Sequence, residues 1–223
     1  MAMRKFIGFI DYATSLYDDQ TETTQFVVDV TAVIHGHEYD PEQGLVFFLG
    51  SGDNSSNYFV GQGKFDQPGN YDEFTHRCSR EGFCDWGWQR RYRDDTGNQA
   101  YHFWFFVAVA YFDSMPTAKF GNLFHEATEL LAKWADPEAP VGPSWEDYNL
   151  SLQGAYLGHQ LANWTGYLTL VESMNSPCPA PDFDWALLYY LTAPQIKPSQ
   201  VPAWLAYNIA DTPLYLPISV RGQ

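Results

Sequence analysis

The chain has 223 residues, of which 45% are hydrophobic and 17% aromatic, so it can bury a full core and is not intrinsically disordered. Its 27 Asp and Glu residues outnumber 12 Lys and Arg residues, giving a formal charge of −15 that repels phosphate backbones. We therefore expect no nucleic acid partner, whereas a cationic protein or a small-molecule ligand is compatible with this field.

The sequence also bears on membranes, location and disulfides. The longest apolar stretch, residues 101–112, is shorter than a bilayer span and contains His102, so we expect no membrane segment. Asp11 interrupts the apolar stretch after the basic start, unlike a signal peptide, and a cytoplasmic location is the default expectation. Cys78 and Cys84 are near enough to pair, but Cys178 is left over, which favours neither a disulfide framework nor a zinc site.

Apolar residues at helical spacing predict helices over residues 4–17 and 24–35. Residues 50–95 are rich in turn-forming residues and predict a long ordered loop or a small β-hairpin. Three longer helices are expected at 97–113, 117–135 and 144–163, and shorter apolar or helical pieces near 166–173, 183–191 and 201–209. The chain is thus predicted to be mainly α, a single-domain multi-helix bundle over residues 1–223.

The helix expected at 97–113 carries Gln99 and His102 one turn apart on the same face. Gln99 ends the segment Thr96-Gly97-Asn98-Gln99, which fits a capping box. His102 lies among aromatic residues, where it is either a satisfied core histidine or a group whose shifted pKa suits proton transfer.

The helix expected at 117–135 has an apolar stripe, the pattern of a helix that buries one face. The stripe consists of Phe120, Leu123, Phe124, Ala127, Leu131 and Trp134. His125 projects nearly opposite it, with Glu126 to one side. Small residues around His125, such as Gly121 and Ala132, suggest that another element approaches this second face, so His125 need not face open water. His125 and Glu129 are four residues apart, a spacing that suits a surface ion pair, a hydrogen-bonded pair or two metal ligands. The segment is not the H-E-x-x-H zinc motif, because Glu129 stands in its last position.

In the helix expected at 144–163, Asp147, Ser151, Gly154 and Gly158 fall on one narrow stripe. Glycine inside a helix lowers stability by roughly 1 kcal/mol relative to alanine, so two on one face indicate close approach of a neighbouring helix or a ligand. Ser144 and Asp147 also resemble a capping box. The stripe would place the Asp147 carboxylate at the rim of a closely packed seam.

These residues also carry a resemblance in pattern. The segment Asp95-Thr96-Gly97-Asn98-Gln99-Ala100-Tyr101-His102-Phe103, the pair His125-Glu126, and Asp147 with its Ser and Gly stripe resemble uncharacterised bacterial helical domains, some associated with toxins. In that group a His-bearing aromatic helix precedes a His-Glu or Arg-Glu pair and an Asp-rich segment with Asn and Gly. Ser151 departs from the group, which often has Asn there. The resemblance spans about residues 95–160, and it marks positions without implying a mechanism.

Two functions from different classes remain open. The first is a hydrolase using general acid–base chemistry between the three long helices, with His102, His125, Glu126 and Asp147 as catalytic residues and Gln99 and Ser151 as binding residues. No metal ligand is assigned and the cofactor is unknown, although a metal-dependent variant would use His125 and Glu129. The alternative is an acidic, non-enzymatic protein that binds a cationic protein partner, whose association would weaken with salt.

Overall fold

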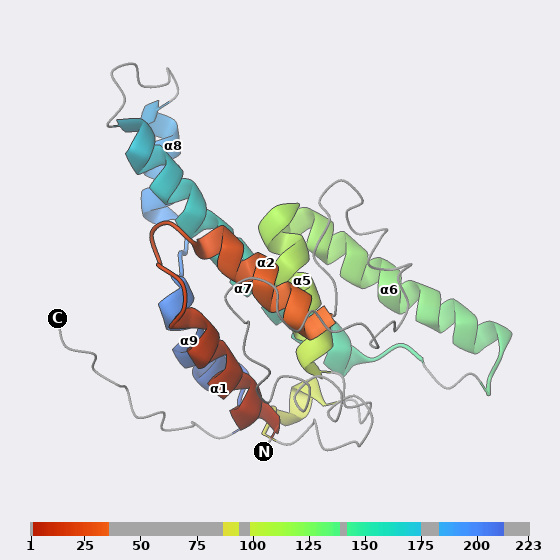
Figure 1. Cartoon of the computed structure of the whole chain (residues 1–223). Coiled ribbons are helices and arrows are strands. Elements are labelled where there is room, and N and C mark those ends of the chain that lie inside the picture. The colour runs from red at the N-terminus through yellow and green to blue at the C-terminus, as the bar shows by residue number, and fades with distance from the viewer. Residues whose placement is uncertain (1, 36–86, 94–98, 139–141, 175–182, 212–223) are drawn as a thin grey trace.

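The computed structural model describes residues 2–35, 87–93, 99–138, 142–174 and 183–211, and they are mainly helical (Figure 1). Within these ranges there is no β-strand, and an isolated antiparallel bridge pairs Trp88 with Ala210. The mainly α architecture is therefore confirmed for this part of the chain, whereas the excursion expected at 50–95 lies outside it except for residues 87–93. No helix of the described part is long and apolar enough to cross a bilayer. The α-helices are α1 (Ala2–Thr14), α2 (Thr23–His35), α5 (Gln99–Phe112), α6 (Met115–Ala135), α7 (Trp145–Met174), α8 (Phe183–Thr192) and α9 (Val201–Asn208).

Aromatic side chains fill the main core. Trp104 of α5 meets Phe6 of α1 and Phe26 of α2 edge to face, with ring centroids 6.4 and 5.9 Å apart. Its indole N–H donates a hydrogen bond of 3.1 Å to the Thr31 hydroxyl, so the buried polar atom is satisfied. Helix α5 is buried on every side over residues 103–110, because it has apolar residues all around its axis.

The glycine stripe of α7 packs directly on the backbone of α5. A Cβ atom on Gly154 would lie 2.1 Å from the carbonyl oxygen of Phe103, and one on Gly158 would lie 2.1 Å from that of Val107. Both residue numbers advance by four between these contacts, so the two helices run parallel. The close helix approach predicted from the glycines is confirmed, and it brings α5 against the face that carries Asp147.

Helix ends differ from the prediction in two places. Helix α6 begins at Met115, two residues before the expected start. Pro116 lies in its first turn, where its missing N–H is harmless, and Ser114 caps the helix by accepting the Thr117 N–H at 3.2 Å. Helix α7 continues to Met174, so the apolar piece expected near 166–173 belongs to it. Nothing breaks the helix here, because Gly166 is tolerated where the chain packs closely on Tyr190 of α8.

Helix α6 is turned the opposite way from its pattern. Its apolar stripe points to solvent, with exposed fractions of 67% for Phe120, 63% for Leu131 and 83% for Trp134. Its polar face, which carries His125, instead lies toward α5 and α7. The expectation that the stripe marks the buried face is wrong. The second face does pack against the rest of the chain, as its small residues suggested, and Ala118 and Gly121 are buried there.

Candidate functional site

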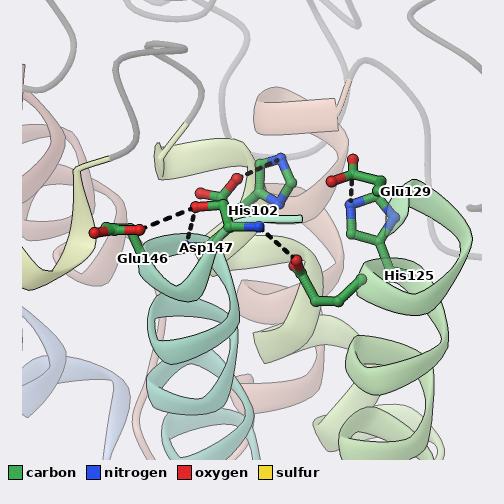
Figure 2. Close-up of polar contacts among 7 residues, drawn as sticks. His102, His125, Glu129, Glu146 and Asp147 are labelled. Atoms are coloured by element: carbon green, nitrogen blue, oxygen red, sulfur yellow. Dashed lines mark hydrogen bonds and ion pairs between the residues drawn. The ribbon is translucent and has the colours of Figure 1, made fainter. Parts of the chain in front are cut away.

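The inward face of α6 brings two histidines and two carboxylates together with α5 and α7 (Figure 2). His102 Nε2 lies 4.0 Å from Asp147 Oδ2, and His125 Nε2 lies 3.3 Å from Glu129 Oε1. The two imidazole rings are 5.7 Å apart between centroids, and His102 stands between Asp147 and the His125–Glu129 pair. Side-chain exposure of 15% for His102 and 28% for His125 leaves both rings within reach of solvent.

The first turn of α7 sets the position of Asp147. Ser144 caps the helix, because its hydroxyl accepts the Asp147 N–H at 3.1 Å. In a reciprocal capping box the Asp147 carboxylate would accept the Ser144 N–H, but Glu126 Oε2 of α6 accepts that N–H at 2.8 Å. Glu126 therefore ties α6 to the start of α7, and the Asp147 carboxylate faces His102 instead.

The distance between His102 and Asp147 is longer than a direct hydrogen bond. Catalytic contacts of this kind are often long without a ligand and tighten when one binds. A carboxylate at this position stabilises the imidazolium that forms when His102 takes up a proton. One side chain of this pair comes from α5 and the other from α7, and an imidazole beside a carboxylate is a combination that can transfer protons.

Burial controls the protonation of His125. Although Glu129 is 3.3 Å away, burial lowers the pKa of His125 below its ordinary 6.5. The ring is therefore neutral at pH 7, and a neutral ring whose Nε2–H points at the Glu129 carboxylate keeps the lone pair on Nδ1 as an acceptor. The pair expected from the four-residue spacing is present as a partly buried contact.

This pKa shift predicts a pH dependence of stability. The unfolded state binds a proton on His125 at a higher pH than the folded state does, so the free energy of unfolding falls as the pH drops below 6.5. On acidification we expect the free energy of unfolding of the wild type to fall relative to that of His125→Asn, which lacks the imidazole. Urea unfolding at several pH values between about 7.5 and 5.5 measures it, and a difference that stays constant with pH would contradict the shift.

The residues predicted to bind, Gln99 and Ser151, are both buried. Gln99 is 0% exposed, one turn before His102 on α5, and Ser151 is 1% exposed, one turn after Asp147 on α7. They lie on the two helices whose seam ends at the site, and neither reaches solvent in this structure. Residues 94–98 lie outside the described residues, so the capping box predicted for residues 96–99 lies mostly outside them as well.

Asn122 is a site residue that the sequence did not reveal. It lies one turn before His125 on α6, is 1% exposed, and donates from Nδ2 to the Tyr148 carbonyl oxygen at 2.9 Å. Its Oδ1 is buried without a hydrogen-bond partner, an uncommon condition for an amide oxygen. Asparagine is a poor helix former, so its place inside a long helix was the available signal.

The described residues contain no group of three or more His, Cys, Asp or Glu side chains arranged for a metal ion. No known protein family, curated protein or solved structure matches the chain. The fold and the site define a helical protein with two neighbouring histidine–carboxylate pairs, and the chemistry of those pairs carries the functional argument.

Proposed function

We propose that this protein is a hydrolase that uses general acid–base chemistry at His102, His125 and Asp147. The observation that carries the proposal is the two histidine–carboxylate pairs on three helices, with their rings 5.7 Å apart. Imidazole is the side chain that most often transfers protons at neutral pH, and a carboxylate behind it is its usual orienting partner. A core histidine kept only for packing would not need a second solvent-reaching histidine beside it.

In this proposal His102 moves the proton. It accepts a proton from the attacking water as the oxygen bonds to the substrate carbonyl carbon, and Asp147 stabilises the resulting imidazolium. His102 then gives the same proton to the leaving group as the bond to carbon breaks. His125, neutral at pH 7, holds the water through Nδ1, while Glu129 fixes the orientation of its ring.

The other predicted residues support this arrangement in different ways. Glu126 is a positioning residue in the proposal, because it holds the start of α7 and so the backbone of Asp147. Gln99 and Ser151 support the two helices from inside the seam. Asn122 ties α6 to the first turn of α7, because its Nδ2 donates to the Tyr148 carbonyl oxygen.

The charge of the chain favours some substrates over others. At −15, the protein repels polyanionic phosphate substrates, and the carboxylates at the site add to this field. Neutral or cationic carboxylic esters and amides are therefore the substrate class that we propose.

The proposal is tested by screening p-nitrophenyl esters, p-nitroanilides and a p-nitrophenyl phosphodiester with the full-length protein. We expect turnover above the uncatalysed rate with an ester or anilide and none with the phosphodiester. The wild type is compared with His102→Ala, so that a contaminating hydrolase is recognised by its equal rate in both preparations. Equal rates for both proteins on every substrate would contradict the proposal, and turnover of the phosphodiester alone would overturn the substrate class.

A further inference from the structure

The outward face of α6 is apolar along most of its length. The large side chains of this face have exposed fractions of 50% to 83%, and every residue from 130 to 138 is exposed. Figure 1 shows α6 running outward from the other helices. The α6 stripe, as we define it from the structure, consists of Phe120, Leu123, Phe124, Ala127, Leu130, Leu131 and Trp134.

The stripe is large enough for a specific interface. With about 150–250 Å² for each whole aromatic side chain, the exposed fractions amount to about 700 Å² of apolar surface. The largest apolar patch of a typical monomer is about 300–600 Å², and a standard interface buries about 800 Å² on each partner. The α6 stripe therefore has the size of one side of an interface.

The stripe is also symmetric about Ala127. Apolar residues stand three, four and seven positions before it and three, four and seven positions after it. A two-fold axis through Ala127 would place Trp134 against Phe120 of the partner subunit, and the small alanines would let the helices approach closely at the crossing. Self-complementarity of this kind is the condition for an isologous interface.

Charge does not oppose such pairing locally. The stripe has no charged residue, Lys119 lies over the ring of Tyr156 of its own chain at 5.5 Å, and Glu126 bonds to Ser144 of its own chain. The net charge of −15 on each copy still repels at long range, and salt screens that repulsion. Pairing through the stripe is therefore expected to strengthen with salt, whereas binding of a cationic partner would weaken.

We propose that α6 is the homodimer interface of this protein, where the α6 stripe packs antiparallel against the same stripe of a second copy about Ala127. This inference is independent of the proposed hydrolase activity, since His125 projects from the opposite face of α6 and His102 belongs to α5.

The test compares the full-length wild type with Ala127→Glu and Ala132→Glu by sedimentation equilibrium in low and high salt. Both alanines are exposed on α6, but Ala132 lies off the stripe, so the second variant is a matched control for charge and helix propensity. Glutamate at residue 127 would lie against the same glutamate of the partner subunit, and the two like charges repel. We therefore expect the dimer dissociation constant to rise by at least about 100-fold. Ala132→Glu should have the same dimer dissociation constant as the wild type. For both proteins this constant should be lower in high salt than in low salt.

Three results would overturn the proposal. If the wild type is monomeric at high protein concentration in both salts, the α6 stripe is not a homodimer interface and binds a different partner. Equal weakening by the two variants would place the interface elsewhere, as would a dimer that Ala127→Glu leaves intact. Circular dichroism of the variants shows whether each keeps its helices, and these exposed substitutions leave the monomer core untouched.

Discussion

Replacement of His102 by alanine is expected to lower kcat/KM for the hydrolysed substrate by about 10²- to 10⁴-fold, the usual contribution of a positioned general acid–base group. The reason is that His102 is the imidazole that faces the Asp147 carboxylate and also reaches solvent. Asp147→Asn should cause a smaller loss, because the imidazole remains while the charge that stabilises its protonated form is removed. Steady-state kinetics on the ester or anilide found in the screen measure both.

His159→Ala is the matched control for this experiment. His159 lies on α7, three turns beyond Asp147, and is partly buried, so its replacement removes an imidazole of similar exposure outside the site. We expect this variant to keep the wild-type kcat/KM. Full activity in His102→Ala would contradict the proposed role, whereas equal losses in both histidine variants would point to a general loss of structure, which urea unfolding of each would reveal.

The sequence was sufficient for the helices and for the main seam. Apolar residues at a spacing of three and four predict where a helix forms. The glycines Gly154 and Gly158 indicate where a neighbouring helix or a ligand comes close, and the structure places α5 there. The close contact between α5 and α7 also places Asp147 beside α5, so local patterns on these two helices accounted for the approach of His102 and Asp147.

Small residues around His125 suggested a neighbour on the second face of α6, but the sequence did not decide which face is buried. Periodicity reports which face of a helix is apolar, but not whether the surface that covers it belongs to the same chain. Here Ala118 and Gly121 allow the polar face to pack inward, and the larger apolar side chains are left outside. The distinction depends on the tertiary arrangement and not on the pattern of the helix itself.

Glu126 and Asn122 illustrate a second limit. Capping rules look three residues along the chain, and they assign the Ser144 N–H to Asp147. The structure gives that N–H to Glu126, eighteen residues earlier, because the two helices meet there. Asn122 likewise bonds to the backbone of the next helix. Contacts between helices decide these roles, and a single sequence does not report them.

Replacement of Gly158 by alanine is expected to destabilise the protein by about 3 kcal/mol, as overpacking of a tight core position does. The added Cβ would lie 2.1 Å from the carbonyl oxygen of Val107 and 2.9 Å from its carbonyl carbon. These are backbone atoms, which cannot rotate away, so α5 must move as a unit. Gly8→Ala is the matched control: nothing lies within 4 Å of its added Cβ in α1, and the better helix propensity should stabilise by up to about 1 kcal/mol.

Urea unfolding of Gly158→Ala and Gly8→Ala separates these effects, and equal stabilisation by both would show that the seam is looser than the structure indicates. Gly158→Ala also tests how the close contact between α5 and α7 supports the site. If α5 moves away from α7, His102 moves away from Asp147, whose distance of 4.0 Å already exceeds a direct hydrogen bond. Gly158→Ala should therefore lower kcat/KM at a temperature where the variant is still folded, although residue 158 lies three turns from Asp147. Such a loss would make the close helix contact part of the proposed chemistry, because it holds the proton-transferring pair together.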